Sequence, residues 1–192
     1  MRKGLMVLLA ALVFLAGCGG PAFKGQTRGG AAPDFTLTDQ NGQPFRLSDQ
    51  KDRVMLLYFG YTYCPDVCPT SLSDFKQVYQ ILGTDAGRVR VVFVTVDPER
   101  DAPPRLKQYL AIFGSDSAFV GLSGTPEQLA PVYKAYDITH EKVPSKTDPR
   151  DYFMNHTAAT FVIDRAGQWQ VTKKYGTSPE EFAADIRLIL HG

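Results

Sequence analysis

Y-F-G-Y-T-Y-C-P-D-V-C-P, residues 58–69, is the stretch of sequence that decides the fold. An uninterrupted apolar run over residues 54–59 leads into it, which is typical of a strand buried on both faces. Apolar residues at helical spacing lead out of it, over residues 69–82. Cys64 and Cys68 therefore stand where a buried strand meets a helix. Two thiols at such a junction indicate either redox chemistry or a soft-metal site.

The helix start bears directly on the chemistry of the two thiols. We expect Cys68 near the N-cap and Pro69 at the first helical position, where proline is favoured. Cysteines at i and i+4 across a helix start can come within disulfide distance. The partial positive charge of the helix N-terminus also favours a thiolate, which is both the nucleophile and the metal ligand. A structural disulfide that closes one turn is the third interpretation, but so short a loop constrains little of the unfolded chain.

Folded structure is predicted to begin at Pro33 with a β-hairpin. Apolar residues alternate with polar ones on either side of the Asn41-Gly42 turn signal, namely Phe35, Leu37, Phe45 and Leu47.

The rest of the chain alternates strands and helices. We expect strands at 89–96, 119–122, 157–164 and 168–175, and helices at 104–113, 125–136 and from 178 onward. The polar segment 137–152 has no periodicity and is predicted to be a long loop, which in a compact domain is often functional. This order predicts an α/β fold, a central sheet with helices on both faces and a hairpin in front.

Composition and charge argue against a nucleic-acid-binding function. The 192 residues are 44% hydrophobic and 21% charged, as expected of a globular protein, with a formal charge of +1. Without residues 1–17, which carry two basic and no acidic side chains, 19 basic residues face 20 acidic ones, a net charge of −1. There is no basic stripe, so we expect no nucleic-acid partner.

The N-terminus is typical of a targeting segment. A short basic region precedes an apolar run at 5–16 that is too short to span a bilayer comfortably. The run ends in L-A-G-C at Cys18, which resembles the lipobox of bacterial lipoproteins. The resemblance implies a signal peptide at 1–17, cleavage before Cys18 and lipidation of that cysteine. The alternative is an ordinary secretory signal with an incidental cysteine.

Residues 18–32 are predicted to form a flexible membrane tether, because they are rich in Gly, Ala and polar residues. The domain, residues 33–192, would then lie on the extracytoplasmic side, in the periplasm or at the cell surface. With Cys18 lipidated, Cys64 and Cys68 remain as a self-contained pair in an oxidising compartment.

A metal site at this pair requires further ligands, and the chain has three histidines. We expect His191, near the C-terminus, and His140, in the polar segment, to be solvated. His156 directly precedes a predicted strand, a position from which its ring can reach the cysteine loop, although a core or surface histidine is the default interpretation of a lone His. Two Cys and one His suit copper better than structural zinc, which takes four protein ligands. Met154 is a candidate weak axial ligand, but we expect it to pack in the core.

Three segments together resemble the SCO/SenC copper chaperones: G-Y-T-Y-C-P-D-V-C-P at 60–69, V-D-P-E-R-D at 96–101 and N-H-T-A-A-T-F-V-I-D at 155–164. The resemblance covers the chain from about residue 33 to its end. It implies a thioredoxin-like fold with an added N-terminal hairpin. It also implies one copper ion, Cu(I) or Cu(II), per chain, bound by Cys64, Cys68 and His156.

The resemblance further implies a role in assembling the CuA centre of cytochrome c oxidase subunit II. That role is delivery of copper, reduction of the acceptor cysteines, or both, and another copper chaperone is a candidate donor. Turnover as an enzyme is not expected, although Cys64 and Cys68 are candidates for a catalytic redox pair.

Two residues depart from the family pattern, and three aspartates near the site are expected to have structural or solvated roles. Asn155 replaces a common Asp before the histidine, and Tyr63 stands where the family often has His or Phe. We expect Asp97 to form a turn, Asp101 to cap a helix and Asp66 to be solvated.

Two further functions compete with the copper chaperone. A membrane-anchored thiol–disulfide oxidoreductase would use the same cysteine pair, although thioredoxins have C-x2-C and the spacing here is one residue longer. A thiol peroxidase is suggested by A-P-D-F-T-L at 32–37, but Thr62 lies two rather than three residues before Cys64 and the expected proline is missing.

Overall fold

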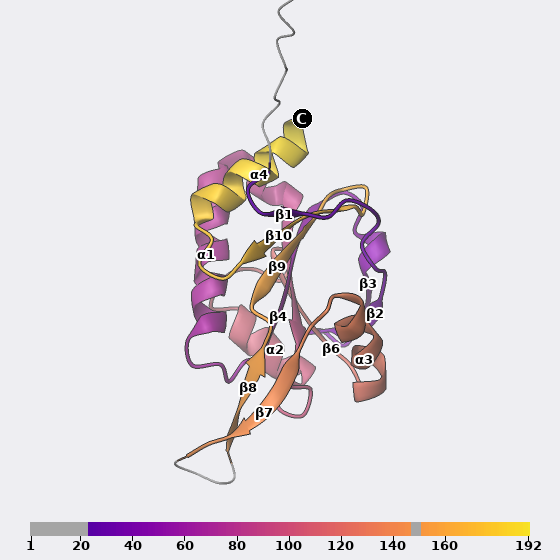
Figure 1. Ribbon diagram of the computed structural model, residues 1–192, viewed down its shortest axis with the longest axis vertical. Helices are drawn as coiled ribbons and strands as arrows, with labels where there is room; N and C mark the ends of the chain where they lie inside the picture. Colours follow the sequence, from indigo (N-terminus) through magenta and orange to yellow (C-terminus); the bar gives the residue numbers. More distant parts are fainter. Residues whose placement is uncertain (1–22, 147–150) are drawn as a thin grey trace, which may run out of the picture.

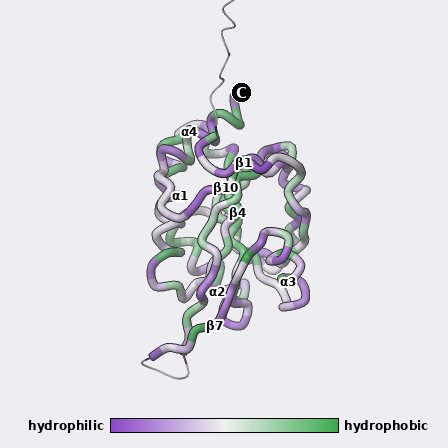
Figure 2. Tube along the Cα trace, viewed as in Figure 1, coloured by the Kyte–Doolittle hydropathy of each residue, from purple (hydrophilic) through white to green (hydrophobic). Residues whose placement is uncertain are grey.

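The strand β4 (Val54–Gly60) is the centre of the sheet, and all seven of its residues are buried. The computed structural model describes residues 23–146 and 151–192. β4 pairs in parallel with β5 (Val89–Thr95) and antiparallel with β9 (Ala159–Ile163). Figure 2 shows β4 as a hydrophobic segment in the middle of the molecule. The prediction of a strand covered on both faces is confirmed.

The described strands form one eight-stranded sheet and one two-stranded sheet. The order in the large sheet is β1 (Gln26–Thr27), β10 (Trp169–Lys174), β9, β4, β5, β6 (Phe119–Ser123), β2 (Thr36–Asp39) and β3 (Pro44–Arg46). The strands β4, β5 and β6 are parallel, and the predicted N-terminal hairpin is β2–β3, antiparallel to β6.

Helices cover both faces of this sheet (Figure 1). They are α1 (Val67–Leu82), α2 (Pro103–Leu110), α3 (Pro126–Ala135) and α4 (Pro179–His191), with short 3-10 helices at Leu47–Asp49 and Gly83–Arg88. Neighbouring side chains of β4 point to opposite faces. Tyr58 packs edge-on against Phe75 of α1, and Phe59 packs against Tyr133 of α3. Phe75 in turn contacts Phe182 of α4, so α1 and α4 share a face.

The helix α1 begins two residues earlier than predicted. Its N-cap is Asp66, so Cys68 is the second helical residue and Pro69 the third. The proline is still tolerated, because the first four amides of a helix have no partner within the helix.

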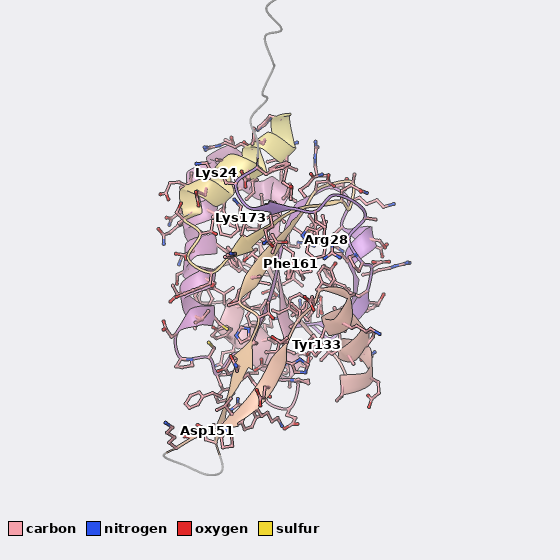
Figure 3. The ribbon with its side chains drawn as sticks, in the orientation of Figure 1. Lys24, Arg28, Tyr133, Asp151, Phe161 and Lys173 are labelled. Atoms are coloured by element: carbon pink, nitrogen blue, oxygen red, sulfur yellow. The ribbon has the colours of Figure 1, made fainter. Side chains whose placement is uncertain are left out.

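The N-terminal boundary of the domain also differs from the prediction. Residues 23–32, expected to be part of a flexible tether, lie against the sheet, and β1 pairs with β10. The backbone N–H of Lys24 donates to both carboxylate oxygens of Asp185 at 3.2 Å, and the Lys173 ammonium donates to the Lys24 carbonyl. Lys173 and Asp185 form an ion pair that is almost completely buried. Figure 3 shows Lys24 and Lys173 together beside α4. Short edge pairing of this kind leaves no apolar pattern in the sequence.

The predicted long loop at 137–152 is wrong for its described part. The strands β7 (His140–Pro144) and β8 (Tyr152–His156) form an antiparallel hairpin, which extends from the end of the molecule opposite α4 (Figure 1). Every residue of β7 is exposed, so its sequence carries no burial pattern. In β8 the more buried residues Tyr152, Met154 and His156 alternate with exposed ones. This alternation covers only three inward positions, too few to predict a strand.

Among residues 23–146 and 151–192, no helix is long and apolar enough to cross a membrane. The predicted signal peptide at 1–17 and the proposed lipidation site Cys18 lie outside the described residues.

The buried ion pair generates a stability prediction. Asp185→Asn leaves the Lys173 ammonium buried without its counter-ion, so we expect a loss of about 3 kcal/mol in the free energy of unfolding, measured with urea. The control is Glu181→Gln, which removes an exposed contact with Lys24 at 3.9 Å and should cost less than about 1 kcal/mol. Equal effects of the two changes would contradict this role for Asp185.

Candidate metal and redox centre

The structure brings Cys64, Cys68 and His156 together. One ligand atom of each, the two sulfurs and an imidazole nitrogen, lie within 4.8 Å of one another. Within the described part of the chain, no other group of three or more Cys, His, Asp or Glu side chains has this arrangement. The two cysteines come from the loop and first turn that follow β4, and His156 comes from the end of β8.

Cys68 is completely buried against the end of β4. A Cβ atom on Gly60 would lie only 2.9 Å from the Cys68 sulfur and 2.8 Å from the ring of Phe93. Glycine at position 60 therefore lets the first turn of α1 approach the strand closely enough to place this sulfur.

The ring of His156 is held in an orientation that suits a ligand. Its Nδ1 lies 3.1 Å from the carbonyl oxygen of Thr157. A carbonyl only accepts hydrogen bonds, so Nδ1 carries the proton. The Nε2 atom then faces the Cys68 sulfur at 3.5 Å, and in the neutral ring its lone pair is free to bind a metal ion.

Two tyrosines that the sequence analysis did not single out form the walls of the site. The rings of Tyr58 and Tyr61 stand edge-on to His156, with centroids at 6.5 and 5.8 Å. The Tyr58 hydroxyl donates a long hydrogen bond, 3.8 Å, to the Cys68 sulfur. Burial raises the pKa of Tyr58, and raises that of Tyr61 to about 12, so both hydroxyls remain protonated.

The two thiols differ strongly in acidity. The pKa of Cys64 is lowered to about 4, first by the hydrogen bond from Cys68, and also by the backbone amides of Asp66 and Cys68. The Cys68 amide lies 3.3 Å from the Cys64 sulfur. Burial, together with the neighbouring Cys64, raises the pKa of the Cys68 thiol. Cys64, which is only half-buried, is therefore the thiolate and the accessible nucleophile of the pair.

The hairpin that carries His156 is held to the domain by the loop at 97–100. The buried carboxylate of Asp97 accepts a hydrogen bond from the Tyr152 hydroxyl at 2.7 Å and pairs with Arg100 at 2.5 Å. The guanidinium of Arg100 lies 3.6 Å from the centroid of the Tyr152 ring and also pairs with Asp151 at 3.1 Å. Figure 3 shows Asp151 near the outer end of the hairpin. The side chain of Asp97 thus does more than form the predicted turn.

Asp101 does not cap a helix, and that prediction is wrong. The N-cap of α2 is Ala102, without a side-chain cap. The carboxylate of Asp101 is fully buried and accepts hydrogen bonds from the amide and hydroxyl of Thr62 and from the hydroxyl of Thr95. It therefore ties the loop before Cys64 to the end of β5.

The remaining candidates lie as follows. His140 stands opposite His156 in the hairpin register, but its ring packs on Tyr133 at 4.4 Å. Met154 is buried in the core, as expected, and His191 and Asp66 are exposed. His191 also pairs with Asp85 at 2.9 Å.

A half-buried thiolate, a buried thiol and an oriented imidazole form a donor set that suits a soft metal ion. The same pair can exchange with a disulfide, because an accessible thiolate stands next to a resolving thiol. The fold and the site thus define a thioredoxin-like protein with a Cys-Cys-His centre.

Comparison with known proteins agrees with this class. The sequence profile of the SCO1/SenC family matches residues 24–191, and the chain belongs to this family. An SCO2-like protein of Rickettsia conorii is 36% identical over 154 residues, which cover 80% of this chain and 74% of that protein.

Solved structures confirm the thioredoxin-like Sco fold. Bradyrhizobium japonicum ScoI with copper bound matches with a TM-score of 0.74 and 42% identity, covering 83% of this chain and 99% of that one. A SCO1/SenC family lipoprotein from Bacillus anthracis has the same fold, with a TM-score of 0.69 and 22% identity over 84% of this chain and 95% of that one.

The acidity of Cys64 predicts its reactivity. In the reduced protein, iodoacetamide should alkylate Cys64 at pH 5–6, because a thiol with a pKa of about 4 is already a thiolate there. Reaction should fall as the pH drops through 4, and Cys68→Ala should move this fall to higher pH by removing the main hydrogen bond. Mass spectrometry identifies the modified residue. Alkylation that begins only above pH 8 would contradict the assignment.

The contact between the hairpin and the loop at 97–100 predicts how firmly His156 is held. Tyr152→Phe removes a hydrogen bond to a charged, buried oxygen, worth about 1.5–3 kcal/mol. Amide hydrogen exchange in β8 should become about 10–100-fold faster, because local opening costs less. Tyr175→Phe, at an exposed tyrosine of the β10–α4 connection, is the control. Unchanged exchange in β8 would show that the Asp97 contact does not hold the hairpin.

Proposed function

We propose that this protein is a copper metallochaperone that binds one copper ion through Cys64, Cys68 and His156. The observation that carries the proposal is the convergence of these three ligand atoms within 4.8 Å in a chain of the SCO1/SenC family. The copper-bound ScoI from Bradyrhizobium japonicum, at 42% identity, supports the choice of metal. Copper is the cargo here, held as Cu(I) or Cu(II).

The geometry suits a metal ion that must leave again. Cys64 is half-buried and lies in a loop, so a thiolate of an acceptor protein can approach it. Cys68 is buried and His156 is held by the hairpin, so these two would retain the ion while one ligand is exchanged. A disulfide between Cys64 and Cys68 would remove both sulfur ligands, so loading requires the reduced pair.

The family acts in the assembly of cytochrome c oxidase. The acceptor proposed for this chain is the CuA site of oxidase subunit II, and the donor is another copper chaperone. Lipid on Cys18, after removal of residues 1–17, would hold the domain at the membrane on its extracytoplasmic side.

Reduction of the acceptor is the second candidate function, supported by the acidity of Cys64. The Cys64 thiolate would attack an acceptor disulfide and release one acceptor thiolate. Cys68 would then displace the second sulfur, so that two electrons pass to the acceptor and Cys64 and Cys68 become a disulfide. This reaction uses the same residues and also requires the reduced pair.

Copper titration tests the proposed site. The reduced protein should bind one Cu(I) per chain in competition with a chromophoric chelator. Cys64→Ser, Cys68→Ser and His156→Ala should each weaken binding by about 100-fold or more, equivalent to about 2.7 kcal/mol. His140→Ala is the matched control, because His140 stands opposite His156 in the same hairpin.

Stoichiometric, tight copper in Cys64→Ser would refute the three-ligand site. Absence of specific copper binding by the wild type, with both thiols intact, would refute the copper proposal in favour of thiol–disulfide exchange. The reduction potential of Cys64 and Cys68 would then be the quantity to measure.

A further inference from the structure

An exposed aromatic ring stands directly before the reactive cysteine. Tyr63 is 50% exposed, and the guanidinium carbons of Arg100 and Arg105 lie 4.8 and 4.9 Å from its ring centroid. These three residues are called the arginine–tyrosine patch below. They lie outside the three-ligand site and have no part in the proposed copper coordination.

The two guanidinium groups differ in how far they are already paired. Arg100 already pairs with Asp97 and Asp151, and its one nitrogen without a partner among the described residues, Nη2, is buried out of reach of a docking protein. Arg105 donates from Nε to the Thr62 hydroxyl at 3.0 Å, and no carboxylate of the described chain lies within 4.0 Å of its guanidinium. Arg105 is only partly buried, so its Nη N–H groups are the ones that an incoming carboxylate can meet.

The helix that carries Arg105 adds to the positive potential. Arg105 lies in the first turn of α2, which has no acidic residue. The helix N-terminus carries a partial positive charge, which adds to the charge of Arg105. A helix C-terminus would instead partly neutralise a cation. Hydrogen bonds connect Arg105 to one carboxylate, that of Asp101, through the Thr62 hydroxyl. Asp101 is fully buried, and its oxygens already accept hydrogen bonds from other groups.

We propose that the arginine–tyrosine patch binds a carboxylate side chain of the protein that exchanges copper or electrons with Cys64. Guanidinium groups bind carboxylates with paired, charge-assisted hydrogen bonds, and Arg and Tyr are enriched among residues that dominate interfaces. An acidic residue that docks on Tyr63 would bring the partner's own metal ligands beside Cys64. This inference rests on the proposed function, since it describes the partner of the same site.

Arg105 is the residue to change. Substitution of Arg100 would also loosen the hairpin, because Arg100 contacts Asp97 and Tyr152. Arg105→Gln removes the charge, and Arg105→Lys keeps it while losing the planar guanidinium. Arg165→Gln, in the exposed turn between β9 and β10, removes a charge at a remote place and is the matched control.

The first measurement needs no partner protein. The reduced protein is mixed with the dianionic disulfide DTNB or the cationic disulfide cystamine. The Cys64 thiolate attacks the probe and releases one probe thiolate, and Cys68 displaces the second to leave a Cys64–Cys68 disulfide. In Arg105→Gln the rate with DTNB should fall about threefold at low salt and the rate with cystamine should rise. Arg105→Lys and Arg165→Gln should resemble the wild type. Equal rates for Arg105→Gln and wild type with both probes would overturn the inference.

The second measurement uses the CuA-binding domain of oxidase subunit II from the same organism as acceptor. The rate of copper transfer in Arg105→Gln should fall about three- to tenfold at low salt, and the difference should shrink as salt is added. Transfer by the wild type with no effect of Arg105→Gln would overturn the inference and leave the chaperone function intact. No transfer by the wild type would count against the proposed function, and the disulfide-probe rates would then decide the inference alone.

Discussion

The complete burial of β4 is the constraint on which the rest of the molecule depends. With neither face open to solvent, the strand must be covered by α1 and α4 on one side and by α3 on the other, and its last residue must be small. Gly60 meets that demand, and the chain turns directly into α1. The buried sulfur of Cys68 is therefore fixed by core packing, whereas Cys64, in the loop, keeps its access to solvent.

Two buried carboxylates join the hairpin and the loop before Cys64 to the end of β5. Asp97 connects the end of β5 to the hairpin through Tyr152, and Asp101 connects it to the loop before Cys64 through Thr62. Each carboxylate is buried and accepts several hydrogen bonds, so loss of one partner leaves a costly unsatisfied oxygen. The loop before Cys64 and the hairpin that carries His156 are thus oriented by polar contacts that begin at the end of β5.

The sequence predicted those features of the fold that depend on a local pattern of residues. The apolar run of β4 and the helical spacing of α1 each need only a local pattern, and both are present. Other features depend on contacts between distant segments. Residues 23–32 and β7 are exposed edges without periodicity, and the role of Asp101 appears only once Thr62 and Thr95 are brought to it. Position in the sequence favoured His156 over His140 and His191, and the family resemblance then implied that it is a ligand.

The fixed position of Lys24 has a consequence for the working distance of the domain. A flexible tether up to residue 32, as predicted, would have let the domain take many orientations relative to a membrane anchor. With Lys24 bound to Asp185, five residues lie between Lys24 and Cys18, the proposed lipidation site, and this number of residues can span at most about 20 Å. Lys24 lies beside α4, and the hairpin with His156 extends from the opposite end (Figure 1). If Cys18 carries lipid, as proposed, the end of the domain with Cys64, Cys68 and His156 would face away from the bilayer, toward partners whose own sites lie about one domain length from the membrane.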